Sequence, residues 1–291
     1  MLTYKFWEQK YYKDNKEKLD YYKNVYKDSA LTIILNFAEN NNHGCRFHCK
    51  FCTWAAINYG IYVYPKDEDV LEFINKYALN MSPIRLCGGG EPLYNFEKNK
   101  EKLKHLTDVI KSTGRATQMT TKDIKTLAEY YDSPYLENVV SYNISIETCD
   151  SFVKDTIAKL LAAGKQVRIS KILNFDCNPE HINIDDIKKY LDYYQFNGQD
   201  GFKIVLRTNY VHALPDDEVN RLKTYFMEYL ESNNIATKFN INKAGSHFKM
   251  LQLTNSEVTH CSNTEEQLFF ELGIKKEDYG DFFADVTISQ K

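Results

Sequence analysis

Residues 84–93 read Ile-Arg-Leu-Cys-Gly-Gly-Gly-Glu-Pro-Leu, a short apolar stretch that runs directly into three glycines. The apolar part is typical of a buried strand at 84–87. The glycines let the backbone approach a ligand closely, with N–H donors able to point toward it. A glycine run before a helix is more often a plain turn, so its meaning depends on the rest of the chain.

Predicted strands and helices alternate along the chain on both sides of this stretch. Strands are predicted at 31–37, 84–87, 116–120, 139–146, 167–173 and 202–206. Helices are predicted at 67–79, 103–110, 124–131, 152–163, 184–196 and 215–230. Such alternation implies an α/β fold with a parallel sheet and right-handed crossovers. Ligands of such folds bind at the carboxyl ends of the strands, and polar or glycine-rich segments follow these strands.

The two ends of the chain lack this alternation of strands and helices, so the sequence predicts three segments. Residues 1–30 are rich in Tyr and Lys at helical spacing, which predicts a helical extension. Residues 31–234 form the expected core, and residues 235–291 form a C-terminal α+β tail. Strands are predicted in this tail at 235–241 and 248–253, and we expect it to cap the substrate side of the core.

The composition is that of a soluble globular protein. The chain has 291 residues, 43% of them hydrophobic, and 37 Lys and Arg against 40 Asp and Glu, giving a net charge of −3. These values exclude a disordered chain and argue against nucleic-acid binding through bulk charge. No apolar run approaches the roughly 18 residues of a membrane span, and the N-terminus lacks the apolar stretch of a secretion signal. We therefore expect a cytoplasmic protein without membrane contact.

Three of the seven cysteines lie in one loop, which reads Cys45-Arg-Phe-His-Cys49-Lys-Phe-Cys52. An odd cysteine count without a secretion signal argues against a disulfide framework, so the cluster predicts a metal site. Iron–sulfur clusters and zinc both accept thiolate ligands at such spacing. The lack of a nearby fourth cysteine favours a cluster with one open iron. The alternative is a non-catalytic zinc protein in which His43 or His48 completes a Cys3His site.

This loop resembles the hallmark of the radical S-adenosylmethionine (radical SAM) superfamily, C-x3-C-x2-C with an aromatic residue before the last cysteine. Cys45, Cys49, Phe51 and Cys52 match it, and the resemblance covers roughly residues 31–210. It implies a partial (β/α)6 TIM-like barrel in which the three cysteines hold an oxygen-sensitive [4Fe–4S] cluster. It also implies that S-adenosylmethionine binds the fourth iron and is reductively cleaved to a 5′-deoxyadenosyl radical, which abstracts hydrogen from a substrate. The electron donor would be a flavodoxin or ferredoxin.

The glycine segment extends the resemblance at the end of the next strand. Gly89, Gly90 and Glu91 match the family's Gly-Gly-Glu-Pro segment, which holds the amino group of S-adenosylmethionine. Later strand ends carry further implied cofactor contacts at Thr120, Ser145, Glu147, Lys171 and Arg207.

Each of these later residues has a specific implied role or an ordinary structural explanation. Ser145 would contact the ribose, Glu147 stands where aspartate is usual, and Lys171 would pair with the methionine carboxylate. Arg207 at a strand end would suit an anionic substrate. The alternatives are a small core residue at Ser145, a solvated strand end at Lys171, and a helix N-cap at Thr120.

The pattern is closest to members of the molybdenum-cofactor-biosynthesis or peptide-modifying type, because the Ser145 and Lys171 elements resemble that branch. A single cluster is expected because only Cys261 lies beyond residue 177. The substrate would be a small molecule, a nucleotide or a peptide. An activase that installs a radical on a partner protein is an alternative, since such enzymes also carry Gly-Gly-Glu-Pro-Leu.

Overall fold

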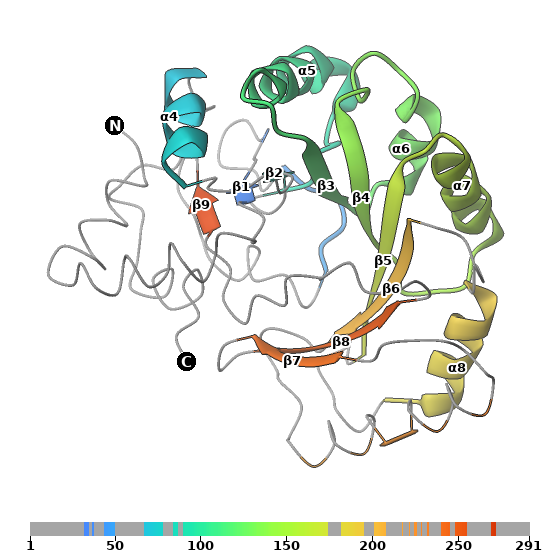
Figure 1. The fold of residues 1–291 in the computed structure, drawn as a ribbon. Helices are drawn as coiled ribbons and strands as arrows, with labels where there is room; N and C mark the ends of the chain where they lie inside the picture. Colours follow the sequence, from blue (N-terminus) through green and yellow to red (C-terminus); the bar gives the residue numbers. More distant parts are fainter. Residues whose placement is uncertain are drawn as a thin grey trace, which may run out of the picture. The chain divides into compact units, whose positions relative to one another are not determined.

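The strands and helices group into two compact units in the computed structural model (Figure 1). The described residues are 32–34, 37, 44–49, 67–77, 84–86, 90–173, 182–194, 201–207, 217, 221, 224, 225, 228, 232, 240–244, 248–254 and 269–271. The first unit comprises residues 1–48, 54–140 and 266–289, and the second comprises residues 49–53, 141–265 and 290–291.

The first unit is built on four parallel strands. In chain order its elements are β1 (Thr32–Ile34), α4 (Asp67–Tyr77), β2 (Ile84–Leu86), α5 (Phe96–Ser112), β3 (Thr117–Thr121), α6 (Ile124–Tyr130) and β9 (Phe269–Glu271). The strands lie in the order β3-β2-β1-β9. Strands β1 and β2 carry the two sequence motifs at their carboxyl ends. The pairing of β9 with β1 adds a strand from the C-terminal segment, which the sequence does not predict.

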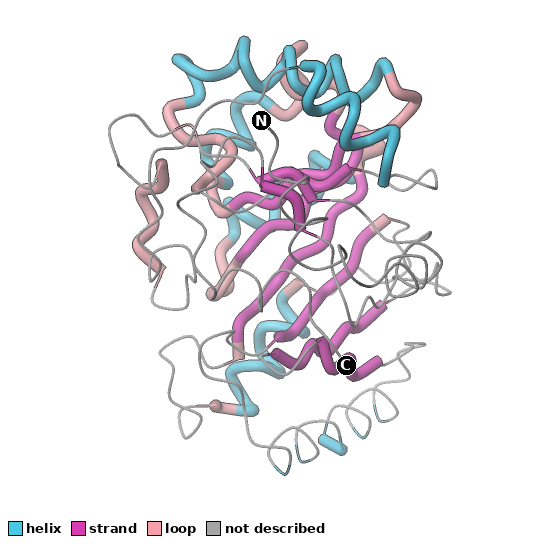
Figure 2. The backbone as a smooth tube through the Cα atoms, turned by 90° about the vertical axis from the view of Figure 1, so that its left-hand side faces the viewer, coloured by secondary structure: helices cyan, strands magenta, loops and turns pink. Residues whose placement is uncertain are grey.

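The second unit continues the alternation and ends in an antiparallel pair. Its elements are β4 (Val139–Ser145), α7 (Ser151–Ala162), β5 (Gln166–Ile172), α8 (Ile184–Tyr193), β6 (Phe202–Arg207), β7 (Asn240–Ala244) and β8 (Phe248–Thr254). Strands β4, β5 and β6 are parallel, β8 is antiparallel to β6, and β7 is antiparallel to β8. The helices lie beside the strands of their unit rather than between them (Figures 1 and 2).

Local sequence explains where the helices begin and end. The Asp150 carboxylate accepts the backbone N–H groups of Phe152 and Val153, which caps α7 at its first turn. After α7, Gly164 adopts a φ of 74°, a conformation that glycine takes without strain. Helix α5 begins at Phe96, earlier than the predicted start at 103. The prediction missed its first turns because they are mostly charged and show no apolar period.

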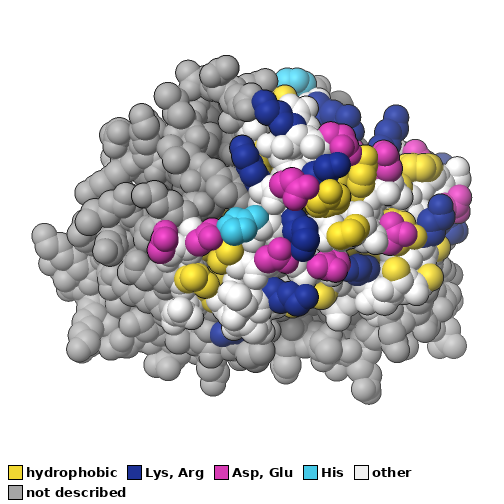
Figure 3. All heavy atoms as spheres, turned by 90° about the horizontal axis from the view of Figure 1, so that it is seen from above, with side chains coloured by type: hydrophobic (Ala, Val, Ile, Leu, Met, Phe, Trp, Pro, Cys, Tyr) yellow, Lys and Arg dark blue, Asp and Glu magenta, His cyan; other side chains and the backbone are white. Residues whose placement is uncertain are grey.

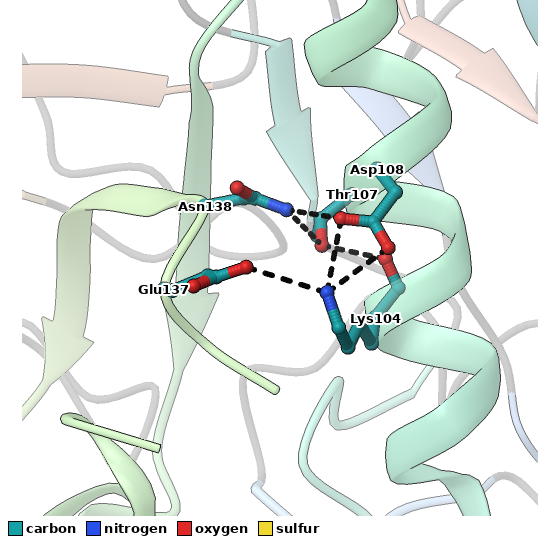
Figure 4. A network of polar contacts seen from close by, with 5 residues as sticks. All are labelled: Lys104, Thr107, Asp108, Glu137 and Asn138. Atoms are coloured by element: carbon teal, nitrogen blue, oxygen red, sulfur yellow. Dashed lines mark hydrogen bonds and ion pairs between the residues drawn. The ribbon is translucent and has the colours of Figure 1, made fainter. Parts of the chain in front are cut away.

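A polar network attaches α5 to the segment before β4 (Figure 4). Lys104 lies 3.0 Å from Asp108, one turn further along α5, and 3.3 Å from Glu137. The Asn138 side-chain amide donates to the same Asp108 carboxylate at 2.6 Å and lies 3.5 Å from the hydroxyl of Thr107. These contacts fix the helix to the chain that enters β4. Figure 3 shows a face of the molecule on which acidic and basic side chains of the described residues are interspersed.

The predicted α/β class with parallel strands is confirmed, and neither unit closes into a barrel among its described strands. The strand predicted at 248–253 is present as β8, whereas the strand predicted at 235–241 overlaps β7 only at residues 240 and 241, and residues 235–239 lie outside the described residues. The predicted N-terminal extension, residues 1–30, lies outside the described residues, and the three-segment division stays a prediction. None of the described helices combines the length and apolar character needed to cross a membrane.

Candidate functional site

The cysteine loop follows β1, as the sequence predicts. Cys45 and Cys49 are partly exposed and neither forms a disulfide, so both thiols suit metal ligation. Gly44 and His48 both have left-handed backbone, with φ of 56° and 44°, which turns the chain tightly around Cys45. Phe51 and Cys52 lie outside the described residues. No three His, Cys, Asp or Glu side chains come together as a metal site within the described part of the chain.

The glycine segment after β2 is joined directly to the cysteine loop. The backbone N–H of Glu91 donates to the carbonyl of Gly44 at 2.9 Å. Strands β1 and β2 are parallel neighbours, so their carboxyl ends meet at one edge of the sheet. Gly90 is partly exposed there, whereas Gly89 lies outside the described residues. The structure therefore brings together the two motifs that carry the family resemblance.

The side chain of Glu91 is buried beneath this edge, with 5% of its surface exposed. Its carboxylate accepts the hydroxyl of Thr121 at 2.5 Å and the backbone N–H groups of Lys122 at 2.9 Å and Leu93 at 3.1 Å. Burial raises the pKa of Glu91 to about 7, against the opposing effect of these three donors. The carboxylate thus ties the glycine segment to the end of β3, and its contact with the cofactor stays a prediction.

Thr120 precedes Thr121 on β3, so its side chain lies on the other face of the strand. It shares that face with Gln118, which accepts a hydrogen bond from Arg85 of β2 at 2.9 Å. The N-cap of α6 is Asp123, whose side chain accepts the backbone N–H of Thr126. The alternative assignment of Thr120 as that cap is therefore wrong, because α6 begins at Ile124, directly after Asp123.

In the second unit, the loop after β4 is held by side chains from β5 and α8. Three successive backbone carbonyls of this loop each accept a hydrogen bond from a side chain. The pairs are Tyr190 with Ile146 at 3.1 Å, Lys171 with Glu147 at 2.6 Å and Tyr194 with Thr148 at 2.8 Å. The backbone of this loop is therefore fixed at three consecutive positions, just beyond the predicted ribose contact at Ser145.

Lys171 lies on the face of β5 that packs against α8. Its ammonium group is 4.9 Å from the centroid of the Tyr190 ring, and burial lowers its pKa although Glu147 opposes the effect. The Glu147 carboxylate in turn accepts the backbone N–H of Ile172 at 3.2 Å. The structure therefore joins Glu147 and Lys171. The binding of the methionine carboxylate by Lys171 stays a prediction.

Ser145 lies on the opposite face from Lys171, because it pairs with Ser170 and successive strand residues alternate between faces. Arg207 is the register partner of Ile172 on β6, and its side chain is not described. The predicted contacts at the ends of β4 and β5 thus divide between the two faces of the sheet.

A buried polar cluster on the Ser145 face is not predicted by the sequence. The side-chain oxygen of Asn143 accepts hydrogen bonds from the Arg168 Nε at 3.0 Å and from the Ser170 hydroxyl at 2.8 Å. Asn143 and Ser170 are both buried. Polar residues at alternate positions of two predicted strands were the available signal, but their pairing requires the register of β4 with β5.

Comparison with known proteins agrees with the two motifs. A family model described as the radical SAM superfamily matches residues 42–174. No curated protein matches the chain. Solved structures with some similarity include SuiB of Streptococcus suis bound to its precursor peptide SuiA, at 16% identity, with a TM-score of 0.47 over 75% of this chain and 50% of SuiB.

Two further solved structures have lower TM-scores. SuiB bound to S-adenosylmethionine is 15% identical, with a TM-score of 0.41 over 70% of this chain and 45% of that one. Coproporphyrinogen III oxidase HemN from Escherichia coli, described as a radical SAM enzyme, is 12% identical, with a TM-score of 0.39 over 76% of this chain and 55% of HemN. This chain spans about half the length of these proteins.

The family match includes both the cysteine loop and the glycine segment and ends two residues beyond β5. Residues 42–174 therefore carry the radical SAM domain that the two motifs predict.

Proposed function

We propose that this chain is a single-cluster radical SAM enzyme that cleaves S-adenosylmethionine reductively and abstracts hydrogen from a substrate. The observation that carries the proposal is the 2.9 Å hydrogen bond from Glu91 to Gly44, which joins the glycine segment to the cysteine loop. A cluster and a cofactor held by these two motifs would be adjacent, and electron transfer between them requires that proximity.

The residues fit a thiolate-ligated cluster by the chemistry of their donors. Cys45 and Cys49 are partly exposed, outside disulfides, and placed on a tight loop. With Cys52 they would hold three irons of a [4Fe–4S] cluster and leave the fourth open for S-adenosylmethionine. When bound and reduced, the cluster supplies one electron to the sulfonium and gives methionine and a 5′-deoxyadenosyl radical.

The chain's own residues bind and position the reactants. The backbone of the glycine segment offers N–H and carbonyl groups at the edge where β1 and β2 end, and the Glu91 carboxylate fixes that segment from below. Tyr190 and Tyr194 fix the loop after β4, next to the predicted ribose contact at Ser145. These anchored segments keep the cofactor contacts pre-organised, so little ordering entropy is lost when the cofactor binds.

The proposals for the substrate and the partners rest on Arg207 and on the family resemblance. A small molecule, nucleotide or peptide is proposed as substrate, and an anionic group on it would suit Arg207 at the end of β6. A flavodoxin or ferredoxin is the proposed electron donor. A thiolate-bound, oxygen-sensitive cluster requires reducing conditions, so we propose that the enzyme acts in the cytoplasm.

Anaerobic reconstitution with iron and sulfide tests the proposal. The expected result is about four irons per chain, with 5′-deoxyadenosine formed from S-adenosylmethionine under a reductant. Cys49→Ala should abolish both, whereas Cys149→Ala is a matched control at an exposed cysteine outside the loop and should abolish neither. A reconstituted chain with an intact cluster and no 5′-deoxyadenosine would contradict the enzymatic role.

The same experiment separates the two alternatives. Stoichiometric zinc that resists chelation in aerobically purified protein would support the zinc-binding protein instead. Radical formation on a partner polypeptide, found together with a stable complex, would support the activase.

A further inference from the structure

The chain on either side of Cys45 is anchored to the body of the first unit. On one side, the carbonyl of Gly44 accepts the backbone N–H of Glu91 at 2.9 Å. On the other side, the guanidinium of Arg46 forms an ion pair with Asp123 at 2.5 Å. A residue whose two neighbours are both held has little freedom to move its backbone. These anchors therefore restrict the backbone that carries Cys45.

The two anchors are connected to each other by hydrogen bonds. The hydroxyl of Thr121 donates to the Glu91 carboxylate at 2.5 Å and accepts the backbone N–H of Asp123 at 2.9 Å. The contacts thus form a closed ring that runs from Gly44 through Glu91, Thr121 and Asp123 to Arg46, with Cys45 closing it through the backbone. We call these residues the Cys45 ring. A closed ring is stiffer than two separate contacts, because neither anchor can move without the other.

The Asp123 end of the ring is itself immobile. Its side chain is 5% exposed and its carboxylate also accepts the backbone N–H of Thr126 as the N-cap of α6. Arg46 is 54% exposed, and its guanidinium carbon lies 5.4 Å from the centroid of the Phe47 ring. An ordinary surface ion pair contributes little, but this one joins a mobile side chain to a buried, capped carboxylate. Arg46 is therefore oriented by a rigid partner rather than by solvent.

We propose that Arg46 is a positioning residue for the iron–sulfur cluster, acting through Asp123 to fix the backbone that carries Cys45. This inference rests on the proposed function, because it assumes that Cys45 binds the cluster. Groups beyond the direct ligands commonly affect metal retention about tenfold or more, and hydrogen bonding and solvent access set cluster potentials. The ring gives the loop after β1 such a support from the end of β3, a strand distant in sequence.

Two variants break the ion pair from opposite ends. Arg46→Gln removes the cation. Asp123→Ser removes the carboxylate, but serine is a good helix N-cap and should preserve α6. In reconstituted protein both variants should lose iron to a chelator about tenfold faster than the wild type, and both should alter the electron paramagnetic resonance spectrum of the reduced cluster. Arg46→Lys keeps the charge and should restore part of the retention. Lys104→Gln, which breaks an ion pair on α5, is the matched control and should change neither readout.

The reduction potential of the cluster distinguishes a positioning role of Arg46 from a direct effect of its charge. If Arg46 acted by its charge alone, Arg46→Gln would lower the potential and Asp123→Ser would raise it, with wild-type iron loss in both. That result, or wild-type behaviour of both variants, would overturn the proposal while leaving the proposed function intact.

The chain without a cluster provides a second test. Amide hydrogen exchange at residues 44–49 should be faster in both variants than in the wild type, since the ring exists without the metal. Unchanged exchange would overturn the anchoring even if the wild-type chain took up no cluster. Absence of cluster uptake by the wild type would contradict the proposed function instead.

Discussion

The buried carboxyl of Glu91 makes the stability of the chain depend on pH, and Glu91→Gln should remove that dependence. Burial raises the pKa of Glu91 from 4.5 to about 7. A raised pKa in the fold means that the protonated form is favoured there. Its stabilising contribution is fully present below pH 4.5 and is lost as the pH rises to about 7.

The magnitude follows from the difference between these two values. The pKa difference, about 7 minus 4.5, multiplied by about 1.4 kcal/mol for each pH unit, gives a loss of about 3–4 kcal/mol between acid and neutral pH. Glutamine resembles the protonated carboxyl in carrying no charge, and its carbonyl oxygen can accept the hydrogen bonds of Thr121 and Leu93, which share one carboxylate oxygen in the wild type. Because glutamine does not titrate, the difference in unfolding free energy should shift in favour of the variant by up to about 3 kcal/mol between pH 5 and pH 8.

Urea unfolding of the cluster-free chain, followed by circular dichroism at pH 5 and pH 8 under reducing conditions, measures this difference. A carbon-13 titration of the carboxyl group that disappears in Glu91→Gln measures its pKa independently. Thr121→Val is the control: it keeps the carboxyl but removes one donor, so the pKa of Glu91 should rise further. If the unfolding free energies of the wild type and Glu91→Gln changed equally between pH 5 and pH 8, the reasoning would be refuted. A variant that loses stability relative to the wild type as pH rises would show that the three donors outweigh burial.

Three further substitutions test contacts of the second unit by urea unfolding. Asp150→Ala removes a cap that accepts two backbone N–H groups, at 2.8 and 3.2 Å, and should cost about 1 kcal/mol. Asn143→Ala removes the acceptor shared by Arg168 and Ser170 inside the sheet and should cost about 1–3 kcal/mol. Tyr194→Phe removes the hydroxyl that holds the loop after β4 and should cost about 1 kcal/mol, with faster amide exchange at Asp150.

An exposed position on α7 supplies the control for these costs. Asp155→Ala should change the unfolding free energy by less than about 0.5 kcal/mol. A loss at Asp150 no larger than this would contradict the capping role, and an equally small loss at Asn143 would contradict the importance of its buried hydrogen bonds. Unchanged exchange in Tyr194→Phe would show that the loop does not depend on that hydroxyl.

Apolar periodicity located most elements because burial of a strand or helix face is a local property of the sequence. The strand predicted at 116–120 is β3 at Thr117–Thr121, and the helix predicted at 152–163 is α7 at Ser151–Ala162. Prediction failed where the local signal was missing. The first turns of α5 are mostly charged, and β9 is too short to show a period, so its pairing with β1 depends on a partner far away in the chain.

The sequence also placed the two motifs of the candidate site. Cysteines after the first strand and glycines after the second had to meet at one edge, because neighbouring parallel strands end on the same side. The functions of single side chains were less predictable. Ser145 and Lys171 were both predicted to contact the cofactor. The structure places Lys171 on the face opposite Ser145, against Tyr190, and this depends on the side on which α8 packs.

By itself, the sequence determined the α/β class, the parallel order of strands and helices, and the superfamily to which residues 42–174 belong. These follow from periodicity and from spacing within short segments. Only the tertiary structure decided that Glu91 is buried against Thr121 and that Arg46 reaches Asp123. Such contacts join residues dozens of positions apart, and hydrogen bonds between them exist only once the strands have paired and excluded water from the edge they share.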